Sequence, residues 1–304
     1  MRRSAAGGAG AEEPLPGFYA GTPGKRGRKG WFLRGVTTFL NFVERSLGRV
    51  PWVKDAYGRI LAGLEAKDVL LPVREDLPAL EGLRIALLSD LHAGPFLGKE
   101  EARRILEVTR AASPDLVCLC GDLIAMGNSD LDLLEPLLAG LDPPLGTFAV
   151  TGNHEFFHGD PALLQARLEE RGIRVLRNRG IRVERGGGSL WVCGVDDPGE
   201  GEPDLEAALE GRRDGEPAIL LCHHPDFFPR AAREGIVLQV SGHTHGGQFR
   251  FFRRALVAHT RLGYLQGLFR RGESLLYVSG GVGAILLPWR IGAPPELPVL
   301  VFPS

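Results

Sequence analysis

Five short hydrophobic runs of this chain each end at a residue type that binds metal ions, and this pattern limits the possible folds more than any other feature. The runs cover residues 83–88, 116–120, 147–150, 219–222 and 236–240. Gly, Pro or polar residues bound them, and helix-like stretches separate most of them, which is typical of buried strands in an α/β protein. Ligands of such folds collect beyond the carboxyl ends of the strands. The sequence therefore predicts one polar site at those ends.

The polar residues after these runs form a near-complete ligand set for two metal ions. Their mixture of oxygen and nitrogen donors suits Mn, Fe or Zn better than Ca or a thiolate site. A single ion takes roughly four to six ligands and a catalytic site keeps one position open, so the set exceeds what one ion needs. Two ions that share a carboxylate would use all of it. The residues are Asp90, His92, Asp122, Asn153, His223, His243 and His245.

A two-metal site of this kind points to a reaction class. Two ions roughly 3.5 to 4 Å apart hold the attacking and leaving oxygens of an in-line phosphoryl displacement and acidify a bound water. The sequence therefore predicts a phosphoester hydrolase.

The same residues resemble the pattern of the calcineurin-like metallophosphoesterases, which is D-x-H, G-D, G-N-H-E, a lone His, and G-H-x-H. All five blocks are present in that order. The G-H-T-H-G-G-Q motif and the segment 287–292 are also similar to a bacterial branch of predicted phosphohydrolases. The blocks stand here as Asp90-Leu91-His92, Gly121-Asp122, Gly152-Asn153-His154-Glu155, His223, and Gly242-His243-Thr244-His245.

The resemblance implies a role for each of these residues. It puts Asp90, His92 and His245 on a first ion and Asn153, His223 and His243 on a second, with Asp122 bridging the two ions. A metal-activated hydroxide would attack phosphorus. His154 would stabilise the charge on the phosphoryl oxygens or protonate the leaving alkoxide. Manganese is the favoured metal among Mn, Fe and Zn.

The resemblance also implies the fold, two packed mixed β-sheets flanked by helices, whereas periodicity alone indicates only an α/β protein. We expect a hairpin over 181–195 and helices over 99–112, 130–139, 161–171 and 204–209. Further strands are expected over 217–222, 236–241, 274–279 and 297–302.

Several polar residues near the motifs have two interpretations. Either member of the pair His223 and His224 could face a metal, and we choose His223 because it directly follows the apolar run. His224 and Arg290 are predicted to contact the substrate phosphate, although Arg290 fits a surface position in a Pro-rich segment equally well. His158 and His259 are expected not to be ligands, with His158 facing solvent.

Composition excludes some functions. The formal net charge is −1, which argues against a nucleic-acid-binding protein with a general basic surface. The four cysteines lie within apolar runs, where a thiol behaves as a small hydrophobic group, and a reducing compartment is the simple inference.

Along the chain we expect three segments. Residues 1–30 should be a disordered basic and Gly-rich tail, 31–78 an amphipathic helical extension, and 79–304 the catalytic domain. The longest uncharged stretch of the extension, between Arg34 and Glu44, is far shorter than the roughly 20 residues that a transmembrane helix requires.

The extension has two interpretations. Its aromatic residues within 31–64 follow a basic cluster, which is the composition of an interfacial membrane anchor. Alternatively, it packs on the catalytic domain or mediates dimerisation. We expect a cytoplasmic protein, peripheral on the inner face of the membrane if the first interpretation holds.

Three functions remain in different classes. The first is a phosphodiesterase or phosphomonoesterase of small molecules. The second is a membrane-associated hydrolase of a lipid-linked phosphate or pyrophosphate, such as a UDP-diacylglucosamine type of substrate. The third is a non-catalytic scaffold on the same fold, which the intact ligand set and His154 disfavour.

Overall fold

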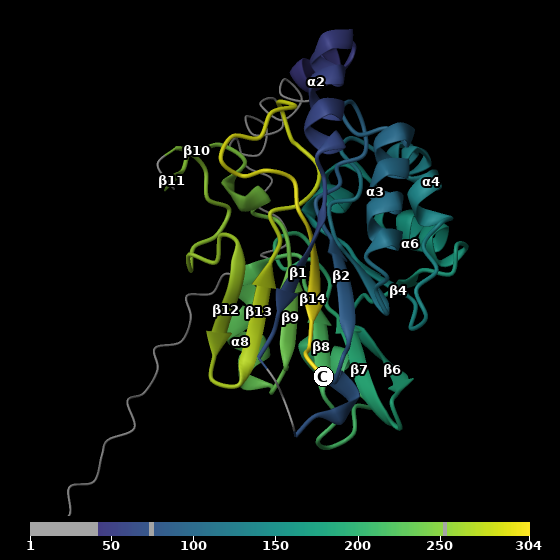
Figure 1. Ribbon diagram of the computed structural model, residues 1–304, viewed down its shortest axis with the longest axis vertical. Coiled ribbons are helices and arrows are strands. Elements are labelled where there is room, and N and C mark those ends of the chain that lie inside the picture. The colour runs from purple at the N-terminus through teal and green to yellow at the C-terminus, as the bar shows by residue number, and fades with distance from the viewer. Residues whose placement is uncertain (1–41, 73–75, 252–253) are drawn as a thin grey trace, which may run out of the picture.

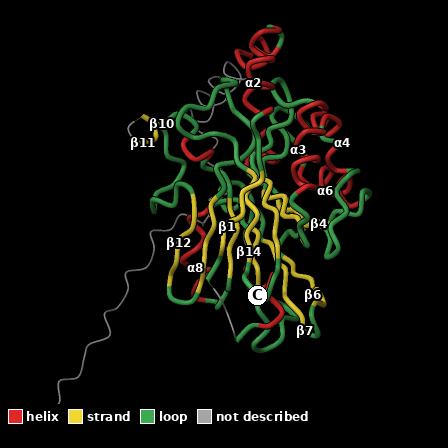
Figure 2. Tube along the Cα trace, viewed as in Figure 1, coloured by secondary structure: helices red, strands yellow, loops and turns green. Residues whose placement is uncertain are grey.

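The computed structural model describes residues 42–72, 76–251 and 254–304. Two six-stranded sheets pack face to face, with helices on their outer faces (Figure 1; Figure 2). The predicted fold, two mixed sheets flanked by helices, is confirmed. Residues 1–41, which include the expected disordered tail, lie outside the described part.

The first sheet has four neighbouring parallel strands, β2 to β5, and two strands that run in the opposite direction, β14 and β1. The strand β14 runs antiparallel to β2, and β1 runs parallel to β14. The order across the sheet is β1 (Ala66–Leu70), β14 (Leu297–Val301), β2 (Arg84–Leu88), β3 (Leu116–Cys120), β4 (Thr147–Val150) and β5 (Arg174–Val175).

The second sheet has a parallel centre, because β7, β8, β9 and β13 run parallel and only the edge strands β6 and β12 are antiparallel to their neighbours. Its order is β12 (Gly267–Arg271), β13 (Ser274–Val278), β9 (Leu238–Ser241), β8 (Ala218–Leu221), β7 (Gly188–Gly194) and β6 (Arg179–Arg185). A separate two-stranded ribbon pairs β10 (Arg250–Phe251) with β11 (Arg254–Ala255).

The sheets bury a shared core between them, and the helices bury the outer faces. Side chains such as Leu87, Phe148 and Leu221 fill the space between the sheets. The outer face of the first sheet packs against α2 (Pro51–Ala62), α3 (Lys99–Ala111) and α6 (Pro161–Glu169). The outer face of the second sheet packs against α7 (Leu205–Leu209) and α8 (Phe228–Arg233).

Most of the predicted helices and strands are present in the structure. The expected continuous helix over 130–139 is not formed. That region forms a 3-10 helix, η2 (Asn128–Leu133), and one short turn, α4 (Glu135–Leu138). Pro136 explains the interruption, since proline has no N–H for a continuous helical hydrogen-bond ladder. The short helix α5 (Asn153–His158) was not predicted, because the residues after the run 147–150 were expected to form a loop.

The expected boundary between an extension and a domain at residues 78 and 79 is wrong. Residues 66–70 are not helical but form β1, which pairs with β14 as the edge strand of the first sheet. The preceding helix α2 packs on the domain through Val53, Tyr57 and Leu61, all of them buried. The described part of the extension therefore belongs to the same body as residues 79–304.

Residues 42–48 are also helical, and they lie on the loops at one end of the sheets. Glu44 is buried there and its Oε2 accepts a hydrogen bond from the backbone N–H of Leu286 at 3.3 Å. Among the described residues, no helix is long and apolar enough to cross a membrane.

Glu44 gives the folded protein a specific pH dependence. Burial raises the pKa of its carboxyl from 4.5 to about 7. Above pH 4.5 the unfolded chain releases this proton, whereas the folded state still holds it. The contribution of Glu44 to the free energy of unfolding therefore falls above pH 4.5 and is lost as the pH rises through about 7. The substitution Glu44→Gln keeps a neutral side chain, so it should be more stable than the wild type above that pH, by on the order of 3 kcal/mol at most.

Urea unfolding of both proteins between about pH 4.5 and 7.5 measures this difference. The control is Glu107→Gln, since Glu107 lies on the exposed side of α3 with a side chain that is 68% exposed. If the difference in the free energy of unfolding between the wild type and Glu44→Gln does not change with pH, the prediction is contradicted.

Candidate metal centre

The seven predicted ligands come together at one end of the two sheets. Asp90 and His92 follow β2, Asp122 follows β3, and Asn153 follows β4. The second sheet supplies His223 after β8 and the pair His243 and His245 after β9. Since these strands run parallel within each sheet, their carboxyl ends meet at the same edge, as the sequence pattern predicted.

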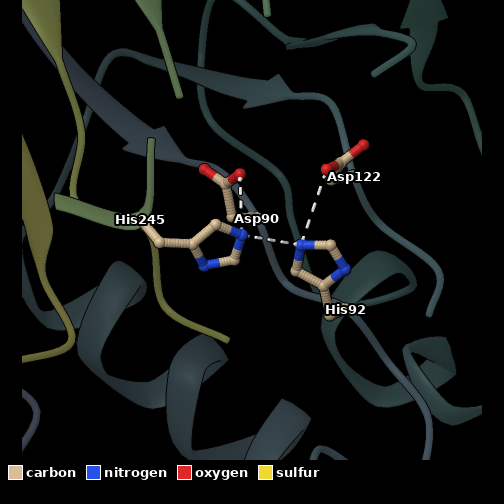
Figure 3. A group of neighbouring side chains, drawn as sticks. All are labelled: Asp90, His92, Asp122 and His245. Carbon is tan, nitrogen blue, oxygen red and sulfur yellow. Dashed lines mark hydrogen bonds and ion pairs between the residues drawn. The ribbon is translucent and has the colours of Figure 1, made fainter. Parts of the chain in front are cut away.

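Four of these residues form a compact, buried group. One possible ligand atom from each of Asp90, His92, Asp122 and His245 lies within 4.8 Å of all the others (Figure 3). His92 Nε2 is 3.1 Å from His245 Nε2 and 3.5 Å from Asp122 Oδ2. His245 Nε2 is 3.6 Å from Asp90 Oδ1.

The ionisation of this group suits a cation. Burial lowers the pKa of His92 and of His245 well below the usual value. The neighbouring His154 lowers the pKa of His92 further, and His92 lowers that of His245. Both imidazoles are therefore neutral, which is the form that binds metal. Two neutral nitrogens that converge on one point beside two carboxylates provide four donors to a single divalent ion.

His223 lies outside this group of four and also faces Asp122. Its Nδ1 lies 2.8 Å from the carbonyl oxygen of Cys120, so the N–H of the ring donates there. The other nitrogen, Nε2, faces Asp122 Oδ2 at 3.3 Å but is not aligned for a hydrogen bond. With a proton on Nδ1, Nε2 is the ring atom that can bind a proton or a metal ion beside this carboxylate.

The same contact explains two opposite pKa shifts. Burial alone would raise the pKa of Asp122, but His223, His154 and His92 hold it well below its usual range. Burial alone would lower the pKa of His223, but Asp122 raises it well above the usual value. The space between the two side chains therefore attracts positive charge, and a divalent ion there would displace a proton.

The remaining predicted ligands are Asn153 and His243. Asn153 Oδ1 lies 2.9 Å from His243 Nδ1, and the rings of His223 and His243 are 5.1 Å apart. Burial and the neighbouring His224 and His223 lower the pKa of His243 well below the usual value, which leaves a neutral ring. Asn153 and His243 thus lie beside His223, which faces Asp122.

The backbone of the site is strained in a way that the sequence did not reveal. Five of the seven predicted ligands have a positive φ in the left-handed region, where a side chain is disfavoured. Strain of this kind costs about 1 to 3 kcal/mol per residue and concentrates at functional sites. The five are Asp90 (53°), His92 (45°), Asp122 (52°), His243 (70°) and His245 (53°).

Glu155 holds two of these loops in place, and the sequence analysis gave it no role. It is fully buried. Its Oε2 accepts hydrogen bonds from the N–H groups of Asp122 at 2.9 Å and Gly152 at 2.7 Å, and its Oε1 accepts one from Leu123 at 2.7 Å. Its place in the G-N-H-E block was the only signal that could have indicated this role.

His154 lies beside the first group of ligands. Its Nδ1 is 3.2 Å from the carbonyl oxygen of Ala125, which leaves Nε2 free for another partner. Its ring is half-buried and packs edge-on against His92, with 4.3 Å between ring centroids. His158 was expected to face solvent, but its ring is half-buried and lies 5.0 Å from that of His154.

The structure distinguishes the two adjacent histidines after β8. His223 is fully buried and faces Asp122, whereas His224 stacks on the ring of His243 with 3.7 Å between centroids. Its Nε2 lies 3.2 Å from Oδ2 of the buried Asp197. This supports the choice of His223 and places His224 on the outer side of His243. His259 is exposed, with its ring 5.6 Å from that of His243.

Arg290 does not have the predicted position for phosphate binding, and it is not a surface residue either. Its guanidinium is buried and donates hydrogen bonds to the backbone carbonyl oxygens of His245, Gly280, Gly283 and Ala293. Four acceptors leave one N–H of the group without a bond. We therefore correct the prediction: Arg290 joins the loop of His245 to the loop that follows β13.

Comparisons with known proteins agree with this site. The calcineurin-like phosphoesterase profile matches residues 83–247. A Danio rerio protein named transmembrane protein with metallophosphoesterase domain is 35% identical over 261 residues, which cover 81% of this chain and 59% of that protein. The Bos taurus protein of the same name is 35% identical over 250 residues, 77% of this chain and 56% of that one.

A bacterial relative matches over most of its own length. The metallophosphoesterase YkuE of Bacillus subtilis is 30% identical over 231 residues, which cover 74% of this chain and 80% of that protein. By contrast, this chain spans less than two thirds of the length of the two vertebrate relatives.

Gly242 tests whether the close packing of the loops matters for metal binding. A Cβ atom at this position would collide with Ser89 Oγ and Asp90 Oδ2. We expect Gly242→Ala to displace the Asp90 carboxylate and to weaken Mn²⁺ binding by about 10- to 100-fold, which calorimetric titration measures.

The control is Gly63→Ala, because the nearest atom to a Cβ there is 3.7 Å away. If Gly242→Ala binds Mn²⁺ as tightly as this control, the Asp90 carboxylate does not contribute to the site as described.

Proposed function

The chain belongs to the calcineurin-like phosphoesterase family, and we propose that it hydrolyses phosphodiesters or phosphomonoesters with two divalent ions at the candidate metal centre. The family and the buried Asp/His cluster make it a metal-dependent phosphoesterase. The number of ions, their ligands and the substrate belong to the proposal.

The contact between Asp122 and His223 carries most of the weight of the two-ion proposal. The group of Asp90, His92, Asp122 and His245 accounts for one ion. The imidazole of His223 lies outside that group, and its inner nitrogen faces Asp122 without hydrogen-bond alignment. A second ion held by His223, Asn153 and His243, with Asp122 shared, would satisfy all of these donors.

The donors also favour a class of metal. Five of the proposed ligands offer imidazole nitrogen or amide oxygen and two offer carboxylate oxygen, which suits Mn, Fe or Zn. The nearby cysteines do not compete, because burial raises the pKa of the Cys120 and Cys222 thiols well above their usual value. Manganese is our preferred ion for the first assays.

Bound divalent ions would polarise the phosphoryl oxygens and activate a water for attack. The protein contributes His154, whose Nδ1–H is held by Ala125 and whose Nε2 is free to give a proton to the leaving oxygen. It also contributes the rigid setting of the ligands, since Glu155 fixes the loop of Asp122 and the adjacent Gly152. Preorganised donors of this kind lose little energy to rearrangement during the reaction.

A second candidate is hydrolysis of a lipid-linked phosphate or pyrophosphate at a membrane. Two observations favour it. The helix over 42–48 contacts the loop that contains Ala125 and Met126, since Arg45 Nε lies 3.0 Å from Met126 Sδ. The two vertebrate relatives are named as transmembrane proteins. Both candidates use the same metal centre.

The substitutions Asp122→Ala and His154→Ala should separate metal binding from proton transfer. Asp122→Ala should lose both bound metal and hydrolysis of bis-p-nitrophenyl phosphate, because it removes the shared carboxylate. His154→Ala should keep its metal content and lose about 100- to 10,000-fold in kcat toward an alkyl phosphate ester. The loss should be smaller with a p-nitrophenyl ester, whose leaving group needs no proton.

Metal content by elemental analysis and turnover on the two esters measure these effects. Equal losses on both esters would contradict the role of His154 as a proton donor. A wild-type protein that binds metal and hydrolyses none of the esters would contradict the proposed function itself.

A further inference from the structure

Three segments far apart in the sequence form one surface around the metal centre. The segment 42–52 contacts the segment 285–292 through the hydrogen bond from Leu286 to Glu44 and through Trp52, whose ring lies 6.3 Å from that of Trp289. The described residues of the segment 249–262, which are 249–251 and 254–262, join the same loop, because the N–H of Arg250 donates to the carbonyl oxygen of Ile291 at 2.7 Å. We call these three segments the rim. Figure 1 shows α2, β10 and β11 at the same end of the molecule.

The rim is next to the proposed ligands. The segment 249–262 begins two residues after η4 (His245–Gly247), which contains a ligand. Arg290 of the rim donates a hydrogen bond to the carbonyl oxygen of His245. On the other side, Arg45 touches Met126, and the neighbouring Ala125 holds the ring of His154. Whatever binds the rim therefore lies close to the substrate.

The rim exposes large apolar side chains. The side chains of Leu256 and Phe42 are 68% and 67% exposed. A single exposed apolar residue is common on a protein surface, whereas a group of them often marks a binding surface. Seven of the eleven large hydrophobic residues that are exposed in the described part of the chain belong to the rim. They are Phe42, Trp52, Phe251, Leu256, Val257, Leu262 and Ile291.

The charge of the rim has one sign. Arg45, Arg49, Arg254 and Arg261 are exposed there. The only carboxylate among the described residues of the rim is Glu44, which is buried and whose pKa burial raises to about 7. The whole chain has a net charge of −1, so this excess of arginine is local. Exposed apolar groups mixed with arginine and without acid match the chemistry of an anionic lipid surface.

We propose that the rim docks on the surface of an anionic phospholipid bilayer and opens the metal centre onto the headgroup layer. The inference deepens the proposed function and rests on it for one consequence, that the substrate is a phosphoester carried by a membrane lipid. The lipid surface is favoured over a protein partner because the three segments contact one another and their exposed charges are arginines. The nearby carboxylate of Asp226 is half-buried and accepts hydrogen bonds from Thr260 and from the backbone N–H of Arg261. Its arginines would pair with lipid phosphates while the apolar side chains enter the interface.

Flotation of the full-length protein with vesicles tests the docking. We expect binding to vesicles of phosphatidylcholine with phosphatidylglycerol and little binding to phosphatidylcholine alone, and we expect added salt to weaken it. The double substitution Leu256→Asp and Val257→Asp should raise the apparent Kd for anionic vesicles by about tenfold or more, because it puts two carboxylates into the interface.

Leu70→Asp is the matched control. Leu70 is 70% exposed, as much as Leu256. It lies beside Val301, which pairs with Arg84 at the start of β2, so it is at the end of the first sheet opposite the metal centre. This variant should bind vesicles like the wild type. Thermal unfolding of all variants shows whether they are folded.

Three outcomes would overturn the proposal. They are no binding to anionic vesicles, binding that the double substitution leaves unchanged, and a dimer in solution that this substitution dissociates. Hydrolysis of bis-p-nitrophenyl phosphate needs no vesicles, so it tests the proposed function independently. Activity without vesicle binding would reject the docking alone, and binding without activity on any ester would reject the proposed function alone.

Discussion

The carboxylate of Asp122 is the constraint on which the rest of the site depends. It is 2% exposed, and its Oδ2 lies 3.5 Å from His92 Nε2 and 3.3 Å from His223 Nε2. A buried carboxylate is unfavourable unless positive charge or hydrogen bonds compensate it. The backbone N–H of His154 donates a hydrogen bond to its Oδ1 at 2.8 Å. Divalent ions bound to it would provide further compensation.

The fold brings residues from both sheets to the buried carboxylate of Asp122. Parallel strands of two different sheets end at one edge, so loops from both sheets reach Asp122. The loops then adopt strained backbone conformations at five ligands. Glu155 and Arg290 hold them with hydrogen bonds to backbone groups, which offset the strain. The strained backbone places the proposed ligands next to the buried carboxylate of Asp122. A bound cation would stabilise this arrangement.

The site was largely predictable from the sequence because its signal is local. Each ligand directly follows a buried apolar run, and such runs identify strands and their ends. The roles of Glu155 and Arg290 were not predictable in this way, since both residues act on backbone groups of distant loops. Their partners depend on how the loops fold. The pairing of β1 with β14 is equally non-local, because it joins residues 66–70 to residues 297–301 and no short pattern in either segment specifies the other.

The contacts of the segment 31–78 were also not predictable from local sequence patterns. Its apolar residues predicted either a membrane anchor or packing on the domain. In the structure α2 packs on the domain through Val53 and Tyr57, while Phe42 and Trp52 of the same region stay exposed. The described part of the segment therefore packs on the domain, a result that depends on tertiary contacts, whereas the membrane anchor stays a prediction.

Anomalous diffraction from crystals grown with Mn²⁺ would test the central claim most directly. The account predicts two peaks, one on each side of Asp122 and about 3.5 to 4 Å apart, with the Asp122 carboxylate bound to both. The first peak should be bound by Asp90, His92 and His245, and the second by Asn153, His223 and His243. A single peak, or two ions that do not share Asp122, would contradict it.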